Sequence, residues 1–150
     1  MQVSHGTISL FLMCMAMATA LGAVFPNSIV FGLLYVLIVA LCTMNVVFSY
    51  CAKCPCRRFG CGHSVFGWLA VKFTNRKDGP YTFFDIASTM ISIAAILLIP
   101  QLWLIESIPA LVLFWTLMVL AGLEILFLVC PDCSNRYCIR NKQFKAPIPR

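Results

Sequence analysis

Apolar residues gather in four long runs, and polar residues gather between the second and third runs and at the end of the chain. The runs cover residues 7–25, 28–50, 83–105 and 108–129. Each is close to the roughly 20 residues that an α-helix needs to cross the hydrocarbon core of a bilayer. The pattern predicts an all-α polytopic membrane protein, a single domain of four transmembrane helices. A loop over residues 51–82 and a tail over residues 130–150 complete the chain.

Prolines mark the expected ends of these helices. Pro26 makes a turn between the first two runs, Pro100 ends or kinks the third, and Pro109 starts the fourth. Inside the loop, residues 65–73 form an apolar patch that is too short to span a bilayer. We expect this patch to lie in the membrane interface, with Trp68 near the lipid headgroups.

The first run has a rival interpretation as a secretory signal peptide, because Ala18-Thr19-Ala20 resembles a cleavage site. The preceding residues carry no Lys or Arg, and the run exceeds the about 7–15 apolar residues of such peptides. We therefore expect a first transmembrane helix. Cleavage would leave three helices with the loop on the same side of the membrane.

Composition and charge agree with a bilayer as the solvent. Hydrophobic residues make up 61% of the chain and charged residues 11%, against about 45–50% and about 25% in soluble domains. All eleven Lys and Arg lie in the loop and the tail. The positive-inside rule then predicts that the loop, the tail and both termini are cytoplasmic. The net charge of +6 accompanies no nucleic-acid-binding motif, so we expect no nucleic-acid partner.

Small and polar residues recur at helical spacing within three runs, and such stripes are typical of contacts between helices in lipid. One stripe is Cys14, Ala18 and Gly22; the second is Cys42, Asn45 and Ser49; the third is Asp85, Ser88, Ser92 and Ala95. We interpret them as packing faces, with Cys14 and Cys42 as small apolar fillers.

Asn45, Asp85 and Glu124 are polar residues near the same ends of their helices. A carboxylate inside a bilayer is costly, so Glu124 should face the bundle interior, be protonated or have a partner. The three can meet in a hydrogen-bonded cluster that fixes the register of the helices. The alternative is a site for a proton, an ion or a quinone.

Two cysteine clusters lie directly after the second and fourth runs. They supply seven thiols and one imidazole as candidate metal ligands: Cys51, Cys54, Cys56, Cys61, His63, Cys130, Cys133 and Cys138. The cytoplasm keeps thiols reduced, so clustered thiols there indicate a metal before a disulfide. Cys51–Cys54 and Cys130–Cys133 are both CxxC pairs, the spacing with which two thiolates hold one ion.

Two partitions of these ligands stay open. In one, the four loop cysteines hold one ion, and the three tail cysteines hold a second ion with His63. In the other, the two CxxC pairs share a single four-thiolate site. We expect structural zinc, with an iron–sulfur cluster as the alternative and juxtamembrane palmitoylation as the case without metal.

These features predict a non-enzymatic membrane protein, an accessory or structural subunit of a larger membrane complex, with a zinc-binding cytoplasmic cap. Its expected partners are the lipid bilayer and other protein chains or further copies of itself. One alternative is a membrane redox protein with an iron–sulfur cluster or redox-active thiols. Another is a small oligomeric transporter that uses Glu124 and Asp85. Hydrolase and P-loop motifs are absent from the sequence.

Overall fold

A computed structural model describes residues 2–57, 64–74, 79–131, 133, 135 and 137. Every regular element in these residues is helical. The longer ones are α1 (Gln2–Val24), α2 (Ile29–Ser49), α3 (Ser64–Phe73), α4 (Phe83–Leu98) and α6 (Ile108–Glu124). The shorter ones are the 3₁₀ turns η1 (Cys51–Lys53) and η2 (Pro55–Arg57), α5 (Gln101–Leu104), and a π-helical turn, η3 (Ile125–Val129).

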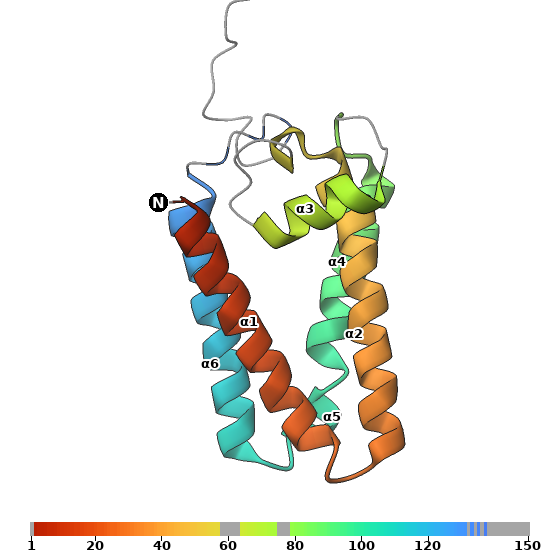
Figure 1. The fold of residues 1–150 in the computed structure, drawn as a ribbon. Helices are drawn as coiled ribbons and strands as arrows, with labels where there is room; N and C mark the ends of the chain where they lie inside the picture. The colour runs from red at the N-terminus through yellow and green to blue at the C-terminus, as the bar shows by residue number, and fades with distance from the viewer. Residues whose placement is uncertain are drawn as a thin grey trace, which may run out of the picture.

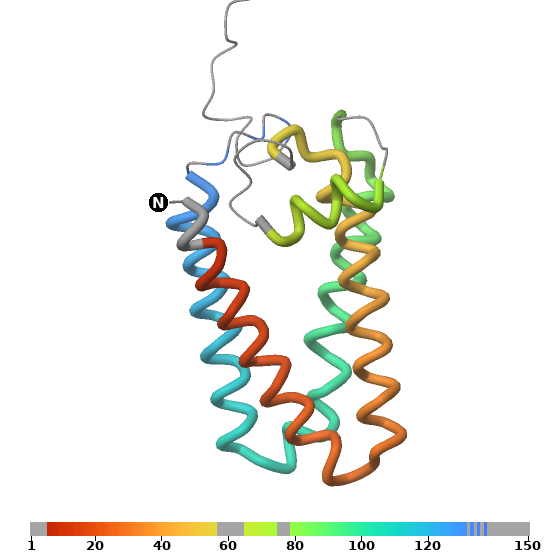
Figure 2. Tube along the Cα trace, viewed as in Figure 1, coloured from red at the N-terminus to blue at the C-terminus, as the bar shows by residue number. Residues whose placement is uncertain are grey.

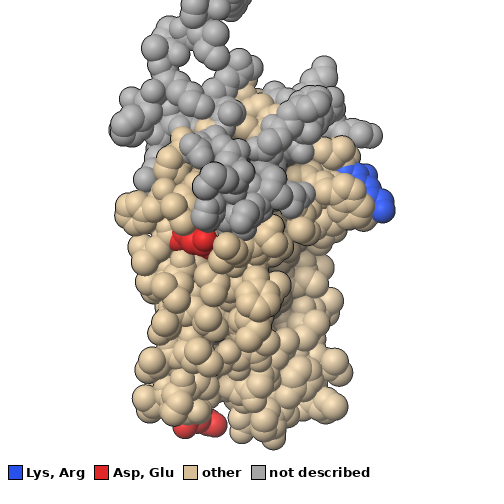
Figure 3. Space-filling view, turned by 60° about the vertical axis from the view of Figure 1, so that its left-hand side comes forward, with Lys and Arg blue, Asp and Glu red and all other residues tan. Residues whose placement is uncertain are grey.

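Four stretches within the described residues are long and apolar enough to cross a bilayer. They are Gly6–Val24, Ile29–Lys53, Phe83–Leu104 and Ile108–Val129. The four predicted spans are thus confirmed to within a few residues. Large apolar side chains are exposed along all four, and Figure 3 shows a long surface nearly free of charged atoms between the two ends of the molecule.

The four long helices form two pairs. α1 packs along α6, and α2 packs along α4 (Figures 1 and 2). The pairs meet at the end that carries the α1–α2 turn and the α5–α6 connection, which we call the turn end. They diverge toward the other end, which carries the N-terminus, η1, η2 and the start of the tail, and which we call the cysteine-rich end. α3 lies across this divergent end and contacts both α1 and α2 (Figure 1).

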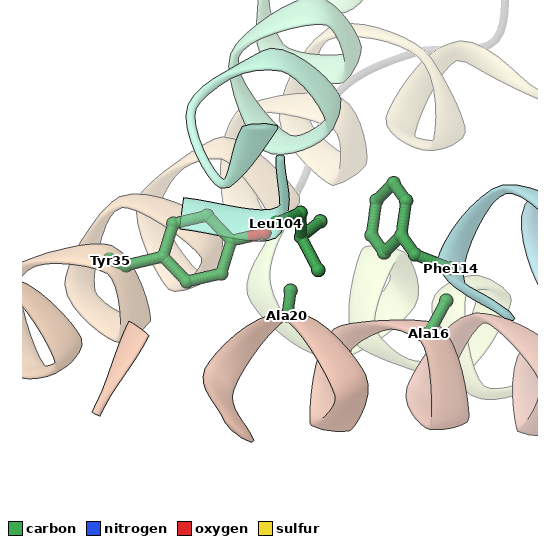
Figure 4. Packing of buried hydrophobic residues seen from close by; sticks show 5 residues of the cluster. All are labelled: Ala16, Ala20, Tyr35, Leu104 and Phe114. Carbon is green, nitrogen blue, oxygen red and sulfur yellow. The ribbon is translucent and has the colours of Figure 1, made fainter. Parts of the chain in front are cut away.

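The two pairs are joined by a core near the turn end. Ala16 and Ala20 of α1 are fully buried against Leu104 and Phe114, and Tyr35 reaches this cluster from α2 (Figure 4). Alanines at this position allow the larger side chains of neighbouring helices to approach the α1 backbone closely. In lipid, such close packing is a main source of helix association.

The predicted small-residue stripe of α1 is wrong. Cys14, Ala18 and Gly22 are exposed, whereas Ala16 and Ala20, on the opposite side of the helix, are buried. Both sets recur every four residues, so each forms a smooth stripe along one face. The position of α6 decides which stripe is covered.

The predicted stripes on α2 and α4 face each other at Asn45, Ser49, Ser88 and Ser92. The Asn45 side-chain amide donates to the hydroxyl oxygens of Ser88 and Ser92, at 2.7 and 2.8 Å. The Ser49 hydroxyl donates to Asn45 Oδ1 at 3.1 Å. Both ends of the Asn45 amide are therefore satisfied inside the bundle, as a polar group in a low-dielectric region requires.

Pro100 breaks the third span as predicted, since α4 ends at Leu98 and α5 begins at Gln101. Proline has no N–H, so the carbonyl of Ile96 loses its normal helical donor. The Tyr35 hydroxyl of α2 donates to that carbonyl at 2.9 Å, and the Gln101 side-chain amide donates to the carbonyl of Leu97 at 2.7 Å. The helix break is thus satisfied by side chains, which is the condition for tolerating proline at membrane depth.

Replacing Tyr35 with phenylalanine should therefore lower the free energy of unfolding by about 1–2 kcal/mol, because the Ile96 carbonyl is left without a donor. Reversible unfolding in mixed micelles measures this change. Tyr50→Phe is the control, because it removes a tyrosine hydroxyl at the opposite end of α2 and leaves the Pro100 break intact. An equal loss of stability in both variants would contradict the assigned role of Tyr35.

Candidate functional site

Each CxxC pair closes the same kind of backbone turn. The amide N–H of Cys54 donates to the carbonyl of Cys51 at 3.1 Å, and that of Cys133 donates to the carbonyl of Cys130 at 3.2 Å. A turn of this size is how a two-residue gap brings a pair of sulfur atoms within reach of one ion. The two sequence-predicted knuckles therefore have equivalent backbone hydrogen bonds.

Thiols from the loop and the tail converge at the cysteine-rich end. The buried Cys56 side chain interacts with the sulfur atoms of both Cys54 and Cys133. Cys54 and Cys56 follow α2, whereas Cys133 follows α6, which belongs to the other helix pair. Burial, and then the neighbouring Cys54 and Cys133 sulfurs, raise the pKa of the Cys56 thiol to about 12. Without a cation the Cys56 thiol is therefore protonated at physiological pH.

A tyrosine hub anchors the tail beside these thiols. The Asn135 side-chain amide donates to the Tyr81 hydroxyl oxygen at 2.8 Å. The Tyr81 ring stacks on Tyr50, with 4.2 Å between centroids, and its hydroxyl interacts with Cys54. Burial raises the pKa of Tyr81 above its ordinary value, with a smaller contribution from Cys54. Tyr81 thus connects the end of α2, the segment before α4 and the tail.

A buried ion pair holds the loop to the start of α4. The Lys53 ammonium contacts the Asp85 carboxylate, and both side chains are almost fully buried. Asp85 also accepts from the backbone N–H and the hydroxyl of Thr82, at 2.8 and 2.6 Å. Thr82 and Asp85 form a capping box at the α4 N-terminus. Asp85 therefore caps a helix and neutralises a buried cation.

The structure describes five of the eight predicted metal ligands. Cys51, Cys54, Cys130 and Cys133 are half-buried and Cys56 is buried. Cys61, His63 and Cys138 lie outside the described residues. Within the described part of the chain, no group of three or more Cys, His, Asp or Glu side chains is arranged to hold a metal ion. The sulfur contacts join Cys56 to one cysteine of each knuckle.

Asn45, Asp85 and Glu124 are distributed over both helix pairs. Asn45 and Asp85 lie in the α2–α4 pair, where Asn45 bonds to serines and Asp85 to Lys53 and Thr82. Glu124 is the last residue of α6, half-buried where the helix changes to the π-helical turn η3. At this end the two pairs diverge (Figure 1). Asn45 and Asp85 therefore have different partners, and Glu124 lies in the other helix pair.

The sequence analysis did not identify the roles of Thr82, Lys53 and Tyr81 in this region. Thr82 could have been found, because Thr82-Phe83-Phe84-Asp85 is a capping-box pattern that assigns Asp85 to a helix start. Lys53 and Tyr81 offered no local signal, because their roles depend on contacts with distant segments.

Comparison of the chain with protein-family models, with curated proteins and with solved structures finds no match.

Proposed function

We propose that this chain is a non-enzymatic integral membrane protein, a structural or accessory subunit whose cytoplasmic cap binds zinc. The observation that carries the proposal is the convergence of Cys54 and Cys56 from the loop with Cys133 from the tail. A buried thiol whose ionisation is disfavoured by burial and by neighbouring thiols is stabilised as a thiolate by a divalent cation. Zinc is the ion that tetrahedral thiolate sites favour most generally.

The residues of the two segments fit such an ion in their chemistry, although the described side chains alone form no group of three or more around it. Cys56 contacts one cysteine of each knuckle, and Cys51 and Cys130 are the other cysteines of the two knuckle turns. Cys61, His63 and Cys138 are further ligands within the same two segments. The cap would hold its metal through residues from both helix pairs. Its role is then mechanical: a bound ion would fix the distance between two pairs that diverge at this end.

The orientation of the cap follows from the distribution of charge. All eleven Lys and Arg lie in segments that leave the bundle at the cysteine-rich end or follow it in the chain, and the connections at the turn end carry none. The positive-inside rule supports a cytoplasmic cysteine-rich end, with both termini on that side. A reducing compartment also suits cysteines that bind metal. The basic loop and tail would offer a docking surface to an acidic partner chain.

The experiment is removal of the metal, followed by hydrogen exchange and mass spectrometry. Because metal binding free energy is local folding free energy, a strong chelator should accelerate exchange in residues 51–57 and 130–137 by at least about 10-fold. The four spans should keep their protection. The Cys42→Ser protein, altered within α2 and away from the cap, should respond in the same way. Unchanged exchange at the cap after chelation would refute a structural metal.

An iron–sulfur cluster is the second candidate, because the same converging thiols would ligate one. A visible absorption band that dithionite bleaches would assign the site to a redox protein. A colourless protein that contains zinc supports the structural assignment.

A further inference from the structure

A pocket of about 350 Å³ opens at the turn end, far from the cysteine cap. It lies between the end of α1, the α1–α2 turn, α5 and the start of α6. Gly22, Ala23 and Ala110 line part of it, and their small side chains leave the space open. A methyl group added at Gly22 would meet no atom within 4 Å. The volume is at the lower end of the range for small-molecule pockets.

The polar lining of this pocket has one charge, the exposed carboxylate of Glu106. The two connections at this end, residues 25–28 and 105–107, contain no Lys or Arg. The described basic side chains Lys53 and Lys72 belong to the other end of the bundle. The visible face of the turn end likewise shows acidic but no basic atoms in Figure 3. A negative charge without a cationic neighbour attracts a positively charged ligand.

Trp103 supplies an aromatic wall to the same pocket. Its ring packs against Phe31 of α2, with 5.6 Å between the ring centroids, and this contact restrains it. An indole face attracts an organic cation more strongly than other aromatic rings do. Thr19, Asn27 and Ser107 add neutral polar groups to the lining.

We propose that this pocket binds a small organic ammonium group, with Glu106 as its counter-charge and Trp103 as its aromatic wall. An inorganic divalent cation fits less well, because Ca²⁺ and Mg²⁺ require six or more oxygen ligands and the pocket offers one carboxylate. The shared chemistry is an alkylammonium, which arrives either on a lipid headgroup or as a free amine. The location at the end of the spans gives access to both sources. This site lies outside the cap and is independent of the proposed metal.

The test compares choline with 3,3-dimethylbutan-1-ol, its neutral carbon isostere, by ligand-observed NMR titration. The full chain is studied in maltoside micelles and amine-free phosphate buffer. We expect choline to bind at least about 10-fold more tightly than the isostere, because only the cation gains from the carboxylate and the ring. Glu106→Gln should abolish this preference, and Trp103→Leu should weaken choline binding. Glu124→Gln, which removes a carboxyl group at the cysteine-rich end, should leave choline binding unchanged.

Nanodiscs separate the two sources of the ammonium group. If the headgroup occupies the pocket, phosphatidylcholine discs should compete with added choline, whereas phosphatidylglycerol discs should not. If a free amine is the ligand, choline should bind equally in both. Equal affinity of the wild-type protein for choline and the isostere would overturn the proposal, as would a preference that survives Glu106→Gln. So would the absence of saturable choline binding in both micelles and phosphatidylglycerol discs.

Discussion

Replacing Asp85 with asparagine should lower the free energy of unfolding by about 3–5 kcal/mol, because it leaves the Lys53 ammonium buried without its counter-charge. The change is nearly isosteric. The new side-chain oxygen can still accept from Thr82, so the capping box survives and the charge is the main difference. Reversible unfolding in mixed micelles measures the loss.

The double variant Lys53→Met/Asp85→Asn should recover a large part of that loss, because it removes both buried charges together. Lys72→Met is the matched control. Lys72 is exposed and lies over the Trp68 ring at 4.7 Å, so its replacement should cost about 0.5–1 kcal/mol. Additive losses in the double variant would show that Lys53 and Asp85 do not stabilise one another.

Replacing Cys133 with serine should weaken zinc binding by more than about 100-fold, which exceeds the about 10–100-fold effect of losing an outer-shell partner of a metal site. Cys133 is the tail residue whose sulfur contacts Cys56, so the substitution removes the thiol contact between loop and tail. Cobalt(II) in place of zinc reports the ligand set through its visible absorption, whose intensity and position change as thiolates are lost.

Cys42→Ser is the control for this experiment. Cys42 is also a half-buried cysteine, but it lies within α2 and outside the cap. Its cobalt spectrum and zinc affinity should equal those of the wild type. A Cys133→Ser protein with an unchanged cobalt spectrum would remove the tail from the proposed site.

The spans could be predicted because apolar runs of bilayer length leave few alternatives. The break in the third span could be predicted because proline cannot continue a helix without losing a hydrogen bond. The packing faces of α2 and α4 could also be predicted, since Asn45, Ser88 and Ser92 are polar residues at helical spacing that must find partners away from lipid. The same rule failed for α1. Small residues stand on two opposite faces of this helix, and only the neighbouring helix distinguishes them.

A site shared by loop and tail thiols was one of the arrangements that the sequence left open, and the sequence did not show how the two segments would meet. The second and fourth spans do not pack as a pair, because α2 pairs with α4 and α6 with α1. Contacts between apolar helices carry little pairing information in the sequence, because lipid and leucine are equally apolar. The tail instead returns to the loop through Asn135 and Tyr81. Those contacts join distant segments and have no local sequence signature.

The most direct test of the metal cap is elemental analysis of the purified full-length wild-type protein, read together with its visible absorption spectrum. We expect one or two zinc ions per chain and no visible absorption band. A protein that purifies folded with neither zinc nor iron would contradict the proposed cap. An iron-containing, coloured protein would replace a structural site with a redox site.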